Sequence, residues 1–291
     1  MRNKQFIYHA MAGVTTVIWG TTFVSSKVLL NAGLSPAEIM FERFLLGYLF
    51  LWLLYPRLPR FHSLHDELIF AGMGIFGGSL YFLAENSALV YAQTSDVSLI
   101  CASVPLVTAI LTHLVLGEQL SRKFRLGSLF AMTGVALVVL NGNFVLKLSP
   151  LGDILAFAAI CCWAVYCLLM RKLRYQYNTL VITRRVFLYG LLTLAPYFLF
   201  TPFRFDISVM SRPEVWGNLL FLGIIASSLC YVMWNSAMRS LGIIRTNSYL
   251  YFTPVVTIVT AAFVLSEHIG IYIVTGAALI LLGLWIAGRK T

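Results

Sequence analysis

The chain has 291 residues, of which 59% are hydrophobic and only 11% are charged, and its mean hydropathy is +0.85. Soluble domains carry about 25% charged residues, so this composition excludes a soluble globular protein and indicates that lipid surrounds most of the chain. A net charge of +10 would suggest a nucleic-acid partner in a soluble protein, but here the placement of the basic residues favours membrane topology and no nucleic acid.

Apolar runs of about 20 residues, the length that crosses a hydrocarbon core, predict ten membrane-spanning helices. In chain order they cover residues 7–29, 36–55, 68–90, 97–117, 124–141, 152–170, 179–200, 216–238, 246–266 and 270–288. Short polar or basic connections separate these runs and leave no room for a soluble domain. The first run is too long for a cleavable signal peptide, so we expect it to be a retained first helix.

The basic residues alternate between the two sides of the predicted membrane. If the amino terminus is cytoplasmic, sixteen of the 21 Lys and Arg residues fall in or beside cytoplasmic connections. The other five are Lys27, Arg43, Lys147, Arg204 and Arg212. Because positive charge accumulates on the cytoplasmic side, this distribution predicts a multi-pass protein of the cell inner membrane with both termini in the cytoplasm.

Polar and glycine residues recur at a fixed distance and divide the chain into two similar halves. Asn86, Pro105, Glu118, Gly127 and Gly134 reappear 149 residues later as Asn235, Pro254, Glu267, Gly276 and Gly283. Asn, Pro and Glu are infrequent in lipid-embedded helices, so these matches indicate a true repeat. The predicted halves are residues 1–143 and 144–291, with five spans each. Because five is odd, the second half enters the bilayer inverted, as in many secondary transporters.

The repeated motifs also resemble those of a known family. They are Trp19-Gly20, Arg43-Phe44-Leu45, Asn86-Ser87-Ala88, Pro105, Leu116-Gly117-Glu118-Gln119-Leu120 and Gly127, then Trp163, Arg185, Asn235-Ser236-Ala237, Pro254, Leu265-Ser266-Glu267 and Gly276. Over nearly its whole length the chain resembles the EamA-like family of the drug/metabolite transporter superfamily. The resemblance implies a ten-helix carrier, with inverted five-helix repeats around a central cavity, for metabolites such as amino acids or for toxic compounds. It implies no single substrate.

Glu85 is the sharpest candidate for a substrate or ion site, because a carboxylate near the middle of a predicted span is costly in hydrocarbon. Gly78 and Tyr81 share its helix face and would open that face to a path. Two interpretations stay open: a cation or proton site, and a structural ion pair with Arg43. Since Trp234 occupies the repeat position of Glu85, we expect the substrate site to lie where the symmetry of the halves fails.

Several aromatic residues lie away from the predicted membrane interfaces, where aromatic belts normally concentrate. They are Trp19, Trp163, Trp234, Tyr81, Tyr166 and Tyr231. They predict an aromatic wall for an organic ligand, with cation–π contact to an ammonium group available. Helix packing is the alternative for each of them. Asn86 and Asn235 could likewise bind substrate, but we favour hydrogen bonds between helices.

Other repeated residues predict structural roles. Pro105 and Pro254 remove a backbone donor inside the fourth and ninth spans, which predicts a bend that acts as a hinge or shapes the cavity. Glu118 and Glu267 lie at span ends, where we expect them to hold loops. The five cysteines lie within predicted spans without the paired spacing of a metal site, so the sequence predicts packing roles for them and no metal or cofactor.

The leading prediction is a secondary transporter, an exporter in preference to an importer, of small organic metabolites such as amino acids or of toxic compounds by alternating access. The sequence has no G-x-x-x-x-G-K-[ST] loop, so a gradient would have to supply the energy, with a proton as the expected coupling ion. Two alternatives are a channel and a serine-protease-like intramembrane enzyme. The enzyme would need Ser79 in the Gly77-Gly78-Ser79 segment to meet a base such as His113. The glycine pattern leaves the oligomeric state open.

Overall fold

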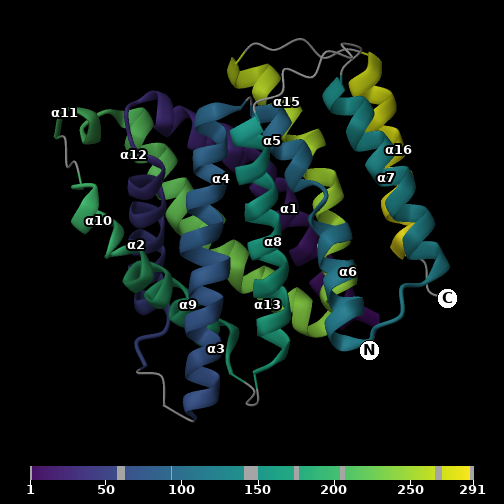
Figure 1. Cartoon of the computed structure of the whole chain (residues 1–291), viewed down its shortest axis with the longest axis horizontal. Coiled ribbons are helices and arrows are strands. Elements are labelled where there is room, and N and C mark those ends of the chain that lie inside the picture. Colours follow the sequence, from purple (N-terminus) through teal and green to yellow (C-terminus); the bar gives the residue numbers. More distant parts are fainter. Residues whose placement is uncertain are drawn as a thin grey trace.

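The computed structural model describes residues 2–57, 63–92, 94–140, 150–173, 177–203, 207–265 and 271–288. All regular secondary structure in these residues is helical, as predicted (Figure 1). The first half contains α1 (Arg2–Asn31), α2 (Pro36–Leu54), α3 (Leu64–Gly74), η1 (Ile75–Ser79), α4 (Leu80–Tyr91), α5 (Thr94–Cys101), α6 (Val104–Leu116) and α7 (Arg122–Leu140). The second half contains α8 (Pro150–Arg171), α9 (Thr179–Leu194), α10 (Tyr197–Phe200), α11 (Ile207–Met210), α12 (Pro213–Leu220), η2 (Phe221–Leu229), α13 (Cys230–Leu241), α14 (Ile243–Asn247), η3 (Ser248–Phe252), α15 (Thr253–Leu265) and α16 (Ile271–Gly288).

Elements that follow one another without a break form longer helices, and each predicted span overlaps a helical segment. Six helices of the described residues are long and apolar enough to cross a membrane: Gln5–Asn31, Leu64–Tyr91, Pro150–Arg171, Thr179–Phe200, Pro213–Leu241 and Ile243–Val264. Two shorter apolar helices cover Val104–Leu116 and Val274–Ala287. Both ends of the chain lie in the lower half of Figure 1, at what we call the N/C end of the bundle.

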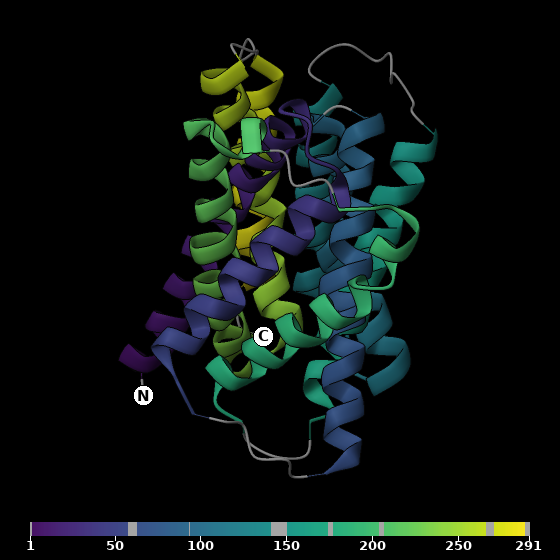
Figure 2. The ribbon, with the colours of Figure 1, turned by 90° about the vertical axis from the view of Figure 1, so that its left-hand side faces the viewer.

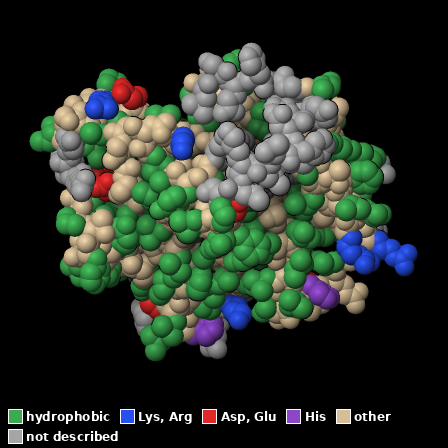
Figure 3. Space-filling model, turned by 45° about the horizontal axis from the view of Figure 1, so that its top comes forward, with side chains coloured by type: hydrophobic (Ala, Val, Ile, Leu, Met, Phe, Trp, Pro, Cys, Tyr) green, Lys and Arg blue, Asp and Glu red, His purple; other side chains and the backbone are tan. Residues whose placement is uncertain are grey.

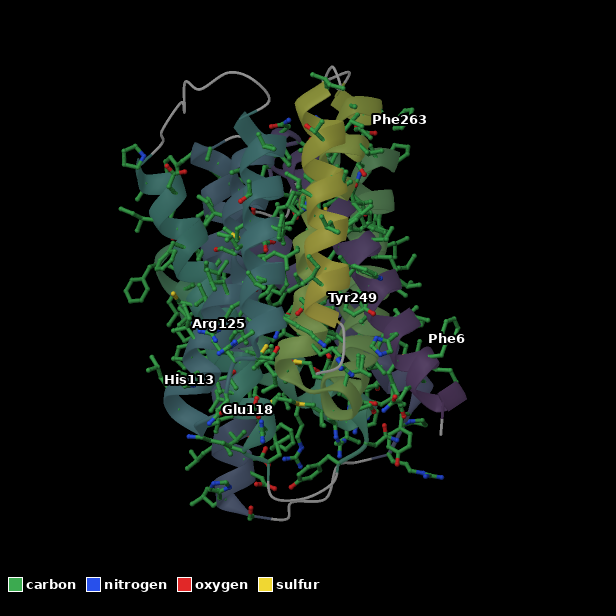
Figure 4. All side chains as sticks on the ribbon, turned by 90° about the vertical axis from the view of Figure 1, so that its right-hand side faces the viewer. Phe6, His113, Glu118, Arg125, Tyr249 and Phe263 are labelled. Atoms are coloured by element: carbon green, nitrogen blue, oxygen red, sulfur yellow. The ribbon has the colours of Figure 1, made fainter. Side chains whose placement is uncertain are left out.

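The outside of the bundle is apolar. Leu53, Leu199, Phe200 and Phe263 are each more than 80% exposed, at 81%, 81%, 88% and 85%. The view in Figure 3 is dominated by hydrophobic side chains, with only scattered charged groups. Figure 4 shows Phe263 at the outer edge of the bundle at the end opposite the N/C end. Large apolar side chains in this number are exposed only where hydrocarbon replaces water, which agrees with a multi-pass membrane protein.

Two wide helical turns interrupt the third and eighth spans at matching positions. η1 and η2 are π-helical, and a shift of 149 residues carries residues 75–79 onto residues 224–228 inside η2. A π turn shifts the hydrogen-bond pattern and is frequent at functional sites. Each turn presents a backbone carbonyl to the other half: Tyr231 donates to Gly77 O at 2.6 Å, and Trp19 Nε1 donates to Ala226 O at 2.8 Å. Gly77 and Ala226 are repeat mates.

The fourth and ninth spans are broken near their prolines. α5 ends at Cys101 and α6 begins at Val104, so Pro105 lies in the first turn of α6, where its missing N–H needs no helical acceptor. In the second half the 3₁₀ segment η3 precedes α15, and Pro254 is the second residue of that helix. Both prolines therefore stand at helix starts. Their role as hinges stays a prediction.

The last helices of the two halves, α7 and α16, pack on each other through the repeated glycines. A Cβ on Gly127 would come within 2.5 Å of Gly283 O, and one on Gly134 within 2.5 Å of Gly276 O. The 149-residue repeat maps Gly127 onto Gly276 and Gly134 onto Gly283. The contact between Gly127 and Gly283 is therefore the repeat equivalent of the contact between Gly134 and Gly276. Reciprocal contacts of this kind follow from a pseudo-two-fold axis between inverted halves. They place the glycine contact within one chain.

Candidate functional site

A cavity lies between the two halves. It holds about 500 Å³ of space free of protein atoms, a figure that includes its open part. Its lining residues come from both repeats: Trp19, Thr22, Phe23, Arg43, Tyr81, Phe82, Glu85, Cys101, Val104, Trp163, Tyr231, Leu250 and Thr253. Six of the ten predicted substrate residues are among them. The wall is therefore mainly aromatic and apolar, with one cationic and one anionic side chain.

Arg43 supplies the cation. It lies on α2, which crosses the bundle obliquely in Figure 2 and packs against α4, η2 and α9. The side chain is only 1% exposed. Its Nε donates to Ser227 Oγ at 3.0 Å, and its guanidinium carbon lies 4.0 Å from the centre of the Phe82 ring. These two contacts fix the guanidinium, while its buried Nη1 has no hydrogen-bond partner.

Glu85 supplies the anion from α4. It is 3% exposed and accepts a hydrogen bond from the hydroxyl of Tyr81, one helical turn earlier on the same face. The structure does not contain the direct salt bridge between Glu85 and Arg43 that was one interpretation of the sequence, although both residues are described. The two groups lie on the wall of the same cavity and interact electrostatically without direct contact, and Arg43 instead contacts Phe82 and Ser227.

The aromatic wall is one continuous cluster. The ring centres of Trp19 and Trp163 lie 5.3 Å apart with the rings at 90°, and Tyr231 lies 5.8 Å from each of them. Tyr81 lies 5.4 Å from Trp163. Edge-to-face contacts of this type stabilise a fixed arrangement of rings. The arrangement presents flat apolar surfaces beside the two charges, which suits an organic ligand better than a hydrated ion.

The other four predicted substrate residues lie behind this wall. Trp234 is fully buried, with its ring centre 4.8 Å from Trp19. Tyr166 donates to Asn235 Oδ1 at 2.6 Å, and Asn235 Nδ2 donates to Thr183 at 3.2 Å. In the first half, Asn86 Nδ2 donates to Pro36 O at 3.2 Å. Both amides thus join helices, the role favoured from the sequence.

The cavity also uses residues that sequence reasoning did not single out as site residues. Phe82, Phe23, Val104, Leu250 and Thr253 are wall residues. Phe82 follows Tyr81 directly, and Thr253 precedes Pro254. Their position next to predicted residues is the one feature of the sequence that could have identified them as wall residues. Apolar residues in a membrane helix carry no mark that distinguishes a cavity wall from a lipid-facing surface.

A second polar group lies outside the cavity and joins α3 to α9. Arg185, which takes the place of Arg43 in the second copy of the family motifs, forms an ion pair with Glu67, and the same carboxylate accepts a hydrogen bond from Tyr189. Arg184 donates to the backbone carbonyls of Tyr55 and Arg57. These bonds fix the start of α9.

The predicted loop-holding glutamates are only partly described. Glu118 forms an ion pair with Arg171 at the start of the connection after α6, and His113 Nδ1 donates to the backbone oxygen of Glu118 at 2.8 Å. Figure 4 labels His113, Glu118 and Arg125 in the part of the bundle toward the N/C end. Glu267 lies outside the described residues, as does the boundary between residues 143 and 144.

Ser79 and His113, the two residues that a serine-protease-like enzyme would need to pair, are hydrogen-bonded to other groups. Ser79 Oγ lies 2.8 Å from Thr193 Oγ1 and donates to Ile75 O, whereas His113 is engaged with the Glu118 backbone. A serine nucleophile needs a base within hydrogen-bond reach, so these two residues do not form a catalytic pair. No group of three or more His, Cys, Asp and Glu residues in the described ranges could hold a metal ion.

Comparison with known proteins gives a consistent result. The sequence model of the EamA-like transporter family matches residues 7–140 and again residues 150–289. The uncharacterized transporter YyaM of Bacillus subtilis is 32% identical over 72% of this chain and 68% of its own length. The aromatic amino acid exporter YddG of Salmonella typhimurium is 28% identical over 78% and 82% of the two chains, respectively. A probable terminal-alkyne amino-acid exporter of Streptantibioticus cattleyicolor is 24% identical over 96% and 92%.

A solved crystal structure shares the fold. It superimposes with a TM-score of 0.72 at 19% identity and covers 94% of this chain and 98% of the other. At this identity the likeness concerns the arrangement of the helices alone.

Proposed function

Since the chain belongs to the EamA-like transporter family, we propose that it exports small organic metabolites, amino acids among them, across the cell inner membrane by alternating access. The observation that carries this proposal is the cavity between the inverted halves, with aromatic walls and two charges of opposite sign that do not contact each other. A wall of this chemistry fits an organic molecule. Inverted halves around one site supply two similar gates.

The direction of transport and the orientation of the protein in the membrane are proposed on other grounds than the cavity. Two relatives bear the name exporter, and the positive-inside distribution favours cytoplasmic termini. The N/C end of the bundle would then face the cytoplasm. We expect a gradient, with a proton as coupling ion, to supply the energy, and Glu85 is the buried carboxylate that would carry that proton. Arg43, Tyr81, Cys101 and Tyr231 are the other titratable groups of the cavity wall.

The test is transport by purified protein in liposomes. Counterflow is measured with a panel of amino acids, nucleosides and organic cations at several pH values, for the wild type and for Glu85→Gln. We expect saturable, trans-stimulated exchange of at least one compound. Exchange without trans-stimulation would favour a channel instead.

The glutamine variant addresses coupling. Glu85→Gln keeps the shape and the hydrogen bond to Tyr81 but removes the exchangeable charge, so transport should be impaired or should change its pH dependence while membrane insertion stays intact. A variant with wild-type kinetics at every pH would contradict a proton or cation role for Glu85.

A further inference from the structure

Arg43 is a buried cation whose charge no carboxylate contacts. It is 1% exposed, and its guanidinium is held by Ser227 and by the face of Phe82, two groups that carry no negative charge. The buried Nη1 is left without a hydrogen-bond partner. The carboxylate of Glu85 acts on this charge only through space, without a direct contact, and a buried charge without a contacting counter-ion is costly. An anionic group in the cavity that Arg43 lines would lower this cost.

Two other buried arginines, Arg184 and Arg185 of α9, differ from Arg43 in having partners for their charge or their N–H groups. Arg185 takes the place of Arg43 in the second copy of the family motifs and is paired with Glu67. Arg184 is held by two backbone carbonyls and stacks 4.3 Å above the ring of Trp52. Neither lines the cavity. Of these three, Arg43 is the one that lines this cavity.

Glu85 completes the site from the neighbouring wall. The Tyr81 and Phe82 rings, 4.8 Å apart, connect the two charges, because Tyr81 donates to Glu85 and Phe82 underlies Arg43. An anion alone would bind Arg43 but would meet the carboxylate of Glu85 in the same cavity. A cation alone would meet Arg43. A ligand that carries both charges pairs each of them.

From this geometry we infer that the cavity selects zwitterions, with a carboxylate bound by Arg43 and an ammonium group bound by Glu85, while the remaining body packs against Trp19 and Trp163. This inference rests on the proposed transport function. It assigns to Arg43 the discrimination between zwitterions and molecules with a single charge.

The experiment compares probes that share one body and differ in charge. Proteoliposome counterflow is measured for L-phenylalanine, 3-phenylpropanoate and 2-phenylethylamine, and for the matching isobutyl set of L-leucine, 4-methylpentanoate and 3-methylbutylamine. For the wild type we expect the zwitterion of at least one set to exchange about tenfold or more faster than either singly charged analogue, because each analogue leaves one buried charge unpaired.

Variants then assign the charges to residues. Arg43→Gln should abolish the advantage of the zwitterion over the amine, and Arg43→Lys should restore much of it, because a lysine keeps the charge without the guanidinium plane. Glu85→Gln should abolish the advantage over the carboxylate. Arg184→Gln, the matched control outside the cavity, should leave both ratios at their wild-type values. Ratios are used because they do not depend on the fraction of folded protein.

Failure of the inference and failure of the proposed function give different results. If singly charged probes exchange as fast as the zwitterions, transport stands and zwitterion selection is wrong. If Arg43→Gln keeps the wild-type ratios, the assignment to Arg43 is wrong. If no organic compound of either probe set or the broader panel exchanges, the proposed function itself fails, and the inference fails with it.

Discussion

Replacing Gly283 by alanine would place a methyl group at the closest point between α7 and α16. A Cβ on Gly283 would lie 2.5 Å from Gly127 O and 2.5 Å from Ala131 N, both of them backbone atoms. Ordinary contact begins at 3.4 Å, so the helices would have to separate locally by up to about 0.9 Å. No side chain can rotate away to relieve the clash. Gly134, the repeat mate of Gly283, makes the equivalent contact with Gly276 O at 2.5 Å.

The net effect combines two opposing terms. Overpacking of a tight contact costs about 1–3 kcal/mol, and the clash with two backbone atoms places this site in the upper part of that range. Alanine in a helix is intrinsically favoured over glycine by about 0.8–1 kcal/mol. We therefore expect Gly283→Ala to lower the free energy of unfolding by about 1–2 kcal/mol. Gly134→Ala should have a similar effect, since the two positions are related by the pseudo-two-fold axis.

The assay is the unfolding of each variant in mixed detergent micelles, with Gly217→Ala as the matched control. Nothing lies within 4 Å of a Cβ on Gly217, which is a helical residue of α12. Its replacement should leave stability unchanged or raise it by up to about 1 kcal/mol. If Gly283→Ala and Gly217→Ala shift the midpoint in the same direction, the close contact between α7 and α16 is not what requires glycine there.

Two further predictions concern hydrogen bonds between helices. Tyr231→Phe removes the donor to Gly77 O and should lower the free energy of unfolding by about 1–2 kcal/mol with little change in shape. A variant as stable as the wild type would show that the π-turn carbonyl needs no donor from the other half. Asn235→Ala should be more destabilising than Asn86→Ala in the same assay, because Asn235 has two side-chain partners whereas Asn86 has one backbone partner. Equal losses would refute this ranking.

Much of the architecture was predictable because it depends on length and recurrence. Runs of apolar residues fix where helices can cross a membrane, and rare polar residues at one spacing revealed the repeat. Which aromatic residues would line the cavity and which would lie behind its wall was not predictable. Tyr231 lines the cavity and Trp234, three residues later, lies behind it, so the outcome depends on the rotation of α13 about its axis. That rotation is set by tertiary packing.

The relation between Arg43 and Glu85 shows a second limit of sequence reasoning. A buried carboxylate predicts a nearby cation, and Arg43 is indeed on the same cavity wall. What fixes the guanidinium is the ring of Phe82 and the hydroxyl of Ser227 from the other half, and no sequence pattern identifies such contacts. The π turns had a weak signal: small residues, Gly77-Gly78-Ser79 and Ala226-Ser227-Ser228, stand at matched positions in both halves.

The two hydrogen bonds from Trp19 and Tyr231 to the π-turn carbonyls have a thermodynamic consequence. Each bond crosses from one half of the chain to the other, and both donors belong to the cavity wall. A ligand that displaces either ring must break a bond between the halves, and a movement of the halves that breaks the bond must change the wall. Ligand affinity and the relative position of the halves are therefore linked functions, and each can be measured by perturbing the other.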